Sequence, residues 1–336
     1  MTVFAQHHAL LIFAVPVAAA FVCAGLIVLL LPSLQRHALS RPNARSSHVK
    51  PTPQGGGIAV IGATAVAVTF LAPDWSGANA TVLAATFCLA LLGMIDDLRP
   101  IPVIPRLALQ ALTIAFLVTM LPAQLRIFQA VPVWIERPLL ALGLLWYLNL
   151  VNFMDGLDWM TVAEMLPMTA ALAAFGLMSE VPAPVLWMAL ALVGALLGFA
   201  PFNRPVARLF LGDVGSLPIG LLTGWCLFEL AGQQHLAAAI LLPLYYLADA
   251  TITLLRRLVN GERFWDAHRS HFYQRATNNG FSVMQVITRV FLLNLFLAGL
   301  AMTSIAGHSI YVDGAVLVLG AGGVAAVLNR FSRARG

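Results

Sequence analysis

An apolar run ends and a cluster of polar residues begins in the stretch Asn149-Leu-Val-Asn-Phe-Met-Asp-Gly-Leu-Asp158. The apolar run at residues 139–150 predicts a helix in lipid. Asn152, Asp155 and Asp158 follow at intervals of three and would share one face of a helical turn. Polar groups at the edge of the hydrocarbon are costly unless they bind something. The stretch therefore predicts a functional site or, alternatively, a capped helix end.

The composition is that of an integral membrane protein. Of the 336 residues, 60% are hydrophobic and 10% are charged, far from the averages of soluble domains. The net charge of +5 would suit nucleic acid, but basic loops on the cytoplasmic side of a membrane explain it more simply, and we expect no nucleic-acid partner. Cys23, Cys88 and Cys226 lie in apolar runs without a CxxC spacing, so we interpret them as free cysteines that act as small hydrophobic residues.

Eleven apolar runs predict the fold class: an all-α polytopic membrane protein with about eleven transmembrane helices in a single domain over residues 1–336. The runs lie near residues 8–31, 57–72, 80–95, 104–121, 138–153, 160–178, 184–200, 215–231, 236–255, 283–303 and 310–328.

The basic residues test this count of helices. If the N-terminus lies outside and the helices alternate, 17 of the 19 Lys and Arg residues fall on the cytoplasmic side, and only Arg126 and Arg137 fall outside. If one helix were miscounted, the basic residues after it would be assigned to the opposite side and the asymmetry would be lost. The same alternation gathers the cytoplasmic acids into clusters and scatters the outer acids singly. The asymmetry predicts a site on the cytoplasmic face.

Two further acidic groups lie at helix ends. Asp96 and Asp97 are adjacent at a helix C-terminus, where they oppose the helix dipole and repel each other. A cation makes such a pair tolerable, and Mg²⁺ prefers hard oxygen ligands. Asp213 lies between Gly212 and Gly215 in a turn before a later helix. Its position fits either a ligand or an N-cap.

The first loop is a candidate anion site. Gly55, Gly56 and Gly57 leave backbone N–H groups at the start of a helix, with His48 and Lys50 shortly before them. A turn that leads into the helix, with the basic residues on lipid phosphate, fits the same residues.

Two later loops carry groups that suit a nucleotide. Asn203 and Phe210 offer an amide edge and a ring face to a planar base. In the longest cytoplasmic loop, the spacing of His268 and His271 would suit zinc, but no further ligand completes such a site. Phosphate binding by His and Arg fits better, and an amphipathic helix on the membrane surface is the alternative.

The orientation of this histidine segment depends on its secondary structure. If the segment is helical, His268, His271 and Arg275 share one face, and Arg269 points elsewhere. Asp249, a lone acid within a predicted helix, is a weaker candidate whose role the sequence leaves open.

Together these motifs resemble one family, the polyprenyl-phosphate N-acetylhexosamine-1-phosphate transferases of glycosyltransferase family 4. The matching elements are P-T-P-x-G-G at residues 51–56, the D-D pair, N-x-x-D-G-x-D at 152–158, N-x-x-P…F-x-G-D-x-G-S at 203–216, and the H-x-x-H loop. They follow the order of the family over nearly the whole chain.

The resemblance implies an enzyme of the bacterial inner membrane with its active site facing the cytoplasm and with Mg²⁺, or Mn²⁺ in its place, as cofactor. It would transfer an N-acetylhexosamine 1-phosphate from a UDP-sugar to undecaprenyl phosphate in the lipid bilayer and release UMP. The resemblance leaves two questions open: whether the protein forms a homodimer, and whether the transfer occurs by direct attack or through an aspartyl-phosphate intermediate.

The resemblance also implies roles for single residues. Asp213 would be the metal ligand beside the pyrophosphate. Asp96 and Asp97 would be the acids on the side of the lipid acceptor and further metal ligands, and one of them would deprotonate the lipid phosphate. The expected catalytic residues are Asp96, Asp97, Asp155, Asp158, His268 and His271, and the expected substrate-binding residues are Lys50, Asn152, Asn203, Phe210 and Arg275.

Departures from the family pattern favour one of its groups. The last loop reads H-R-S-H-F-Y-Q-R, unlike the consecutive histidines of the peptidoglycan enzyme. The chain is therefore more similar to the enzymes that start O-antigen or related surface glycans, and phospho-N-acetylmuramoyl-pentapeptide transferase is the alternative. A transporter of an anionic solute is a rival class. The acids of such a transporter should lie near the bilayer midplane in repeated halves of the chain, whereas here they are predicted at helix ends on one face.

Overall fold

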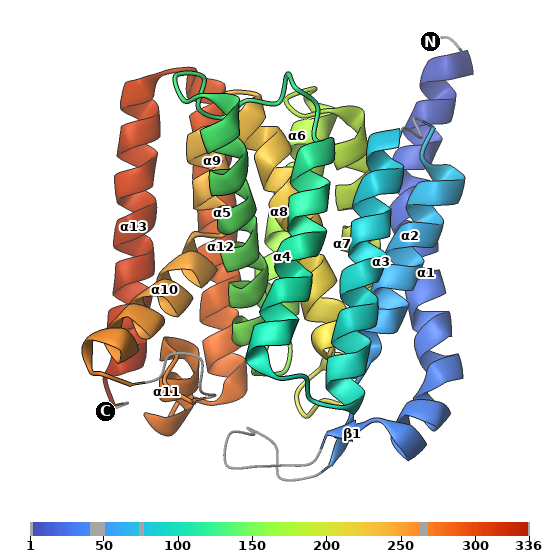
Figure 1. Cartoon of the computed structure of the whole chain (residues 1–336), viewed down its shortest axis with the longest axis vertical. Helices are drawn as coiled ribbons and strands as arrows, with labels where there is room; N and C mark the ends of the chain where they lie inside the picture. Colours follow the sequence, from blue (N-terminus) through green and yellow to red (C-terminus); the bar gives the residue numbers. More distant parts are fainter. Residues whose placement is uncertain (1–2, 41–50, 74–76, 263–267, 335–336) are drawn as a thin grey trace.

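The computed structural model describes residues 3–40, 51–73, 77–262 and 268–334. Long helices stand side by side as a bundle, with the two termini at opposite ends (Figure 1). The elements are α1 (Val3–His37), β1 (Leu39–Ser40), β2 (Thr52–Pro53), α2 (Gly56–Leu71), α3 (Gly77–Leu98), α4 (Val103–Met120), α5 (Val133–Met154), α6 (Met160–Leu177), α7 (Ala183–Asn203), α8 (Asp213–Gly232), α9 (Leu236–Leu241), α10 (Leu244–Val259), α11 (Phe272–Asn278), α12 (Val283–Gly307) and α13 (Ile310–Ser332).

The predicted all-α polytopic membrane fold is confirmed. Within the described residues, nine helices are long and apolar enough to cross a membrane, and α2, at 16 residues, is a shorter apolar helix. Each of the eleven predicted apolar runs is helical for most of its length. The hydrophobic runs therefore predict the elements well.

The run at residues 236–255 is the exception, since the expected single helix is wrong. The chain forms α9 and α10 instead, separated at residues 242–243. Pro243 has no N–H for the helical ladder, and its ring clashes with the carbonyl group four residues earlier. Helix α10 therefore leaves the axis of the bundle and runs obliquely across it (Figure 1).

Helix α8 lies at the centre of the bundle, and glycines bring two other helices close to its first turn. A Cβ atom on Gly57 of α2 would lie 2.2 Å from the Cα atom of Gly215. A Cβ atom on Gly93 of α3 would lie 2.3 Å from the carbonyl oxygen of Asp213. This close approach places the C-terminal turn of α3 beside the N-terminus of α8.

We call the end of the bundle that carries β1, α11 and the C-terminus the site end (Figure 1). All five predicted aspartates lie there. Asp96 and Asp97 occupy the last turn of α3, Asp155 and Asp158 follow α5, and Asp213 begins α8. Residues that are far apart in the sequence are thereby gathered into one region.

Candidate active site

Asp97 faces the N-terminus of α8. Its Oδ1 and Oδ2 atoms accept hydrogen bonds from the backbone N–H groups of Asp213 and Val214, at 3.0 and 3.1 Å. The carboxylate opposes the dipole of its own helix but lies at the positive end of another. Gly212, with φ of +77°, is required here because a Cβ atom would lie 2.5 Å from an oxygen of Asp97. Asp97 therefore serves as a cap for α8.

Asp96 and Asp213 share one guanidinium group. Arg106, in the first turn of α4, places its Nη1 atom 2.8 Å from Oδ2 of Asp96 and 3.6 Å from Oδ2 of Asp213. Oδ1 of Asp96 also accepts a hydrogen bond of 2.6 Å from the N–H of Ile101. Arg106 carries no role predicted from its motif, although its position ten residues after Asp96 was a usable signal. The contact makes Arg106 part of the site.

Asn152 links α5 to the start of α8. Its Nδ2 atom donates to Oδ1 of Asp213 at 2.7 Å and to Oγ of Ser216 at 2.8 Å. Asp213 therefore has an amide donor on one carboxylate oxygen and the Arg106 guanidinium near the other. The predicted grouping of Asn152 with the aspartates matches this geometry, and its role in substrate binding stays a prediction.

The donor set can be compared with the needs of the implied Mg²⁺. One carboxylate oxygen of Asp96 and one of Asp213 lie near the same Nη1 atom of Arg106. Two hard oxygen ligands are therefore close together, beside a positively charged guanidinium group. In the described part of the chain, no three His, Cys, Asp or Glu residues form a metal-sized cluster. Mg²⁺ commonly binds through one or two carboxylates together with substrate phosphates. Asp213 and Asp96 fit that pattern, whereas Asp97 has both oxygens bonded to α8.

A cavity of about 430 Å³ lies beside these residues and has two different walls. Its polar wall includes Arg106, Asn152, Asp213, His268 and His271. Its apolar wall comes from α4, α5 and α10 and is formed by Val103, Leu107, Leu142, Leu145, Trp146 and Leu254. Leu107 and Leu142 are exposed on the outside of the bundle, where lipid would lie. The cavity can therefore receive a ligand with a charged head and a hydrocarbon tail.

The histidine segment reaches this cavity without being a helix. Helix α11 begins at Phe272, and His271 is its N-cap residue, so the condition of a helical segment from His268 is not met. The rings of His268 and His271 still lie 4.9 Å apart between centroids, and both line the cavity. Arg275 instead places its guanidinium carbon 5.8 Å from the centre of the Phe272 ring. Its predicted substrate role stays a prediction.

Asn203 and Asp158 hold a loop in place. Oδ1 of Asn203 accepts a hydrogen bond from the N–H of Trp159 at 2.7 Å, and its Nδ2 donates to the carbonyl of Leu209 at 2.9 Å. Oδ2 of Asp158 accepts from the N–H of Ala207 at 2.9 Å. Both side chains fasten the loop at 204–212 to the turn after α5. The predicted roles of Asn203 in substrate binding and of Asp158 in catalysis are not tested by this geometry.

Asp155 lies close enough to other carboxylates to be affected by their charge. Its carboxylate accepts a hydrogen bond from the Thr161 hydroxyl. Burial raises the pKa of Asp155 to about 6, the Thr161 bond lowers it, and the charges of Asp97 and Asp158 raise it further. Asp155 is thus electrostatically linked to the other aspartates. Lys50 lies outside the described residues.

The glycine amides of the first loop are not free to bind an anion. The N–H groups of Gly55 and Gly56 donate to the carbonyl of Phe210 at 3.2 and 2.9 Å, and that of Gly57 donates to Leu211 at 2.8 Å. The N–H of Phe210 in turn donates to the carbonyl of Pro53 at 2.9 Å. The alternative reading, a turn that leads into α2, is the observed one, and it fixes the backbone on either side of the Phe210 ring.

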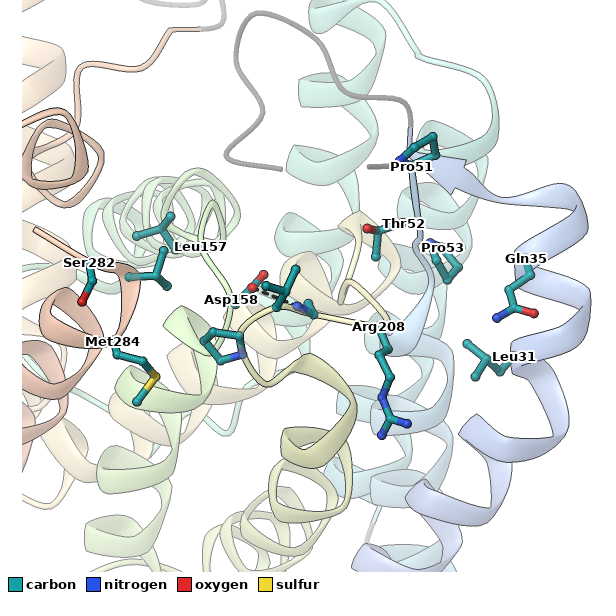
Figure 2. A pocket seen from close by; sticks show the side chains of 14 residues that line it. Leu31, Gln35, Pro51, Thr52, Pro53, Leu157, Asp158, Arg208, Ser282 and Met284 are labelled. Carbon is teal, nitrogen blue, oxygen red and sulfur yellow. Dashed lines mark hydrogen bonds between the residues drawn. The ribbon is translucent and has the colours of Figure 1, made fainter. Parts of the chain in front are cut away.

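A second, larger cavity of about 1000 Å³ opens beside this loop. Figure 2 shows Asp158 between two walls, with Leu31 and Gln35 of α1 on one side and Ser282 and Met284 on the other. Arg208 belongs to the same lining. This cavity borders the region in which the sequence predicts nucleotide contacts.

A bundle of membrane helices with a cavity at one end, polar on one wall and apolar on the other, defines a class of protein: a polytopic membrane protein with a two-sided pocket that could receive an amphipathic ligand. Residues 79–231 match the family model described as glycosyl transferase family 4. The matched segment contains the aspartates of α3, the turn after α5 and the start of α8. The predicted resemblance is thereby confirmed: over this segment, somewhat less than half of the chain, the protein is similar to glycosyl transferase family 4.

Similar proteins include transferases that differ in the lipid or sugar in their names. A decaprenyl-phosphate N-acetylglucosaminephosphotransferase of Mycolicibacterium smegmatis is 29% identical over 296 residues, 76% of this chain and 72% of that protein. A probable undecaprenyl-phosphate N-acetylglucosaminyl 1-phosphate transferase of Bacillus subtilis is 24% identical over 82% of this chain and 81% of its own. A phospho-N-acetylmuramoyl-pentapeptide-transferase of Moorella thermoacetica is 29% identical over 60% of this chain and 68% of its own.

Proposed function

We propose that the chain transfers an N-acetylhexosamine 1-phosphate from a UDP-sugar to undecaprenyl phosphate and releases UMP. The observation that carries the proposal is the two-sided cavity beside Asp213. Its polar wall holds Arg106, Asn152 and two histidines, and its apolar wall opens where lipid would lie. A polyprenyl phosphate has the matching chemistry, an anionic head on a hydrocarbon tail. The names of the relatives support the same reaction class.

The reaction needs positioning and charge neutralisation more than covalent help. A phosphate oxygen of the lipid attacks the β-phosphorus of the UDP-sugar, the bond from that phosphorus to the bridging oxygen breaks, and UMP leaves with the bridging oxygen. Arg106 would hold the phosphates between its two carboxylate partners, and Asn152 would orient Asp213. Bound Mg²⁺, held by Asp213 and Asp96, would supply further neutralisation of the pyrophosphate charge.

Asp97 has a different part in this proposal. Because its oxygens accept the first N–H groups of α8, we propose that it holds Asp213 in place. Asp96 then remains the acceptor-side acid of the pair.

We further propose that the site faces the cytoplasm of a bacterial inner membrane and that the product starts a surface glycan of the O-antigen type. The charge split supports the orientation, since 17 of the 19 Lys and Arg residues fall on one side. The histidine segment reads H-R-S-H-F-Y-Q-R, without consecutive histidines, and this supports a role in starting a surface glycan.

The test is UMP release by the purified protein in nanodiscs with undecaprenyl phosphate, Mg²⁺ and a panel of UDP-N-acetylhexosamines. We expect UMP with at least one donor, only when the acceptor is present, with loss in chelator and recovery on adding Mg²⁺. UDP-N-acetylmuramoyl-pentapeptide is included because one relative carries that activity in its name. UMP from that donor alone would reassign the sugar, and no UMP from any donor with folded protein would refute the proposal.

A further inference from the structure

Asp249 of α10 is a buried carboxylate that the proposed reaction does not use. Its side chain is inaccessible to solvent. Oδ1 accepts a hydrogen bond from the N–H of Phe272 at 2.9 Å, and Oδ2 accepts from the N–H of Tyr273 at 3.1 Å. The hydroxyl of Tyr245 donates to Oδ2 at 3.1 Å. Asp249 therefore caps α11 from a neighbouring helix.

Capping alone does not account for the position of this carboxylate. Burying a carboxylate is costly unless its oxygens are fully hydrogen-bonded, and an imidazole N–H can supply one of these bonds. In the described part of the chain, the basic group that lies within 4.0 Å of Asp249 is the imidazole of His271, whose Nδ1 atom is 3.3 Å from Oδ1. The same oxygen thus holds the first N–H of α11 and the histidine that precedes it.

The ring of His271 is held on several sides. It stacks on Tyr273 at 5.8 Å between centroids, with 22° between the planes, and lies 4.9 Å from the ring of His268. Its side chain is 3% exposed, yet the residue lines the 430 Å³ cavity together with Asp213 and Arg106. With Nδ1 directed at Asp249, Nε2 is the ring nitrogen left for the cavity.

A carboxylate on one ring nitrogen sets the tautomer and orientation of a histidine, and so decides what the other nitrogen presents. We propose that Asp249 is a positioning residue that keeps the proton of neutral His271 on Nδ1 and directs Nε2, with its lone pair, at the ligand. In the cavity, Nε2 would accept a hydrogen bond from a ligand hydroxyl or a protonated phosphate oxygen. The inference rests on the proposed function for the identity of that ligand.

The break between α9 and α10 makes this arrangement available. A straight helix through residues 236–255 would have carried Asp249 along the axis of the bundle. The oblique path of α10 after Pro243 instead brings Asp249 to the N-terminus of α11 (Figure 1).

The tautomer can be measured without any activity. We propose ¹⁵N-histidine labelling in nanodiscs, with the His271 signals identified by their loss in His271→Gln among the eight histidines. We expect a protonated Nδ1 and an unprotonated Nε2 in the wild type, and a mixture of tautomers in Asp249→Asn. Tyr245→Phe is the matched control, because it removes a hydrogen bond from the same carboxylate but leaves His271 its partner. A protonated Nε2 in the wild type, or an unchanged tautomer in Asp249→Asn, would overturn the inference.

Kinetics separate positioning from a structural role. If Asp249 acts through His271, UMP release by the double variant Asp249→Asn/His271→Gln should be no lower than by His271→Gln alone, whereas independent effects would multiply. We expect kcat of Asp249→Asn to fall at least about tenfold, the size of the loss when a partner that orients a histidine is removed, with kcat of Tyr245→Phe near wild type. Multiplying losses would contradict the inference. If the wild type releases no UMP at all, the proposed function fails while the tautomer measurement still decides the role of Asp249.

Discussion

The carboxylate of Asp97 accepts a hydrogen bond of 3.0 Å from the backbone N–H of Asp213, a residue 116 positions later in the chain. A second bond, to the N–H of Val214 at 3.1 Å, completes the cap. The last turn of α3 is thereby joined to the first turn of α8, and Asp96 is brought within reach of the same arginine as Asp213. Within the acidic pair, Asp97 therefore caps α8, and Asp96 contacts Arg106.

Removing one acceptor oxygen of Asp97 should loosen this joint. Asp97→Asn leaves one carbonyl oxygen for two N–H donors, so we expect a loss of about 1 kcal/mol of stability, the usual size for a helix cap, and lower turnover. Thermal unfolding in nanodiscs measures the first and UMP release the second. Glu262→Gln, which removes the exposed partner of an ion pair with Arg257, is the control. A wild-type melting temperature for Asp97→Asn would mean that the cap does not hold α8.

Asp213→Asn should abolish turnover and preserve the fold. The amide can still accept a hydrogen bond from Asn152, but it lacks the charge that faces Arg106 and that would hold Mg²⁺. We expect kcat to fall by at least about two orders of magnitude, as is typical when a group that stabilises the transition-state charge is removed. Unfolding and size-exclusion profiles serve as the control. Near-normal turnover in folded protein would remove Asp213 from the site.

Phe210→Ala separates the ring from its backbone. The hydrogen bonds of Phe210 to Pro53 and Gly56 use main-chain atoms, so alanine should keep the loop in place. If the ring stacks on uracil, KM for the UDP-sugar should rise roughly 5- to 150-fold, the equivalent of about 1–3 kcal/mol per stacked base. The kcat value should change less. An unchanged KM would assign the ring to packing.

The histidine segment should show an uneven sensitivity. His268 and His271 line the cavity, so we expect His268→Ala and His271→Ala to lower kcat strongly. Arg269→Ala should have a much smaller effect, because Arg269 is not part of the cavity lining. Steady-state kinetics of the three variants, each checked for normal unfolding, measure this. Equal and mild effects would leave only an anchoring role for the segment.

Asp155 should make stability depend on pH. Its pKa is about 6 in the folded chain against an ordinary value of 3.8, so the folded state holds the proton more tightly. The stability it contributes is present below the unfolded pKa and is lost as the pH rises through the folded pKa. Asp155→Asn should therefore raise the melting temperature more at about pH 8 than at about pH 4. Equal shifts at both pH values, measured without divalent cations, would contradict the raised pKa.

Local patterns predicted the helices and the gathering of the five aspartates at one end of the bundle. Apolar length marks a spanning helix without knowledge of its neighbours, and acids at helix ends were found because such positions need a partner. The break at Pro243 was visible as a proline within an apolar run, but the run was read as continuous.

Partners across the chain could not be predicted in the same way. The three glycine amides of the first loop looked free because the carbonyls that bind them, those of Phe210 and Leu211, come from a loop more than 150 residues later. The roles of Arg106 and Asp249 likewise depend on which helix packs beside them. A spacing rule describes one helix face and carries no information on the facing helix.

The central claim is that the sugar moves together with its phosphate, and the fate of the β-phosphorus of the donor tests it most directly. The purified protein would be given UDP-N-acetylhexosamine labelled with ³²P at the β-position, undecaprenyl phosphate and Mg²⁺, with Asp213→Asn in parallel. The account predicts that the label enters the organic-soluble lipid as unlabelled UMP is released, and that Asp213→Asn leaves the label on the donor. Label recovered as UDP, with the sugar alone on the lipid, would contradict it.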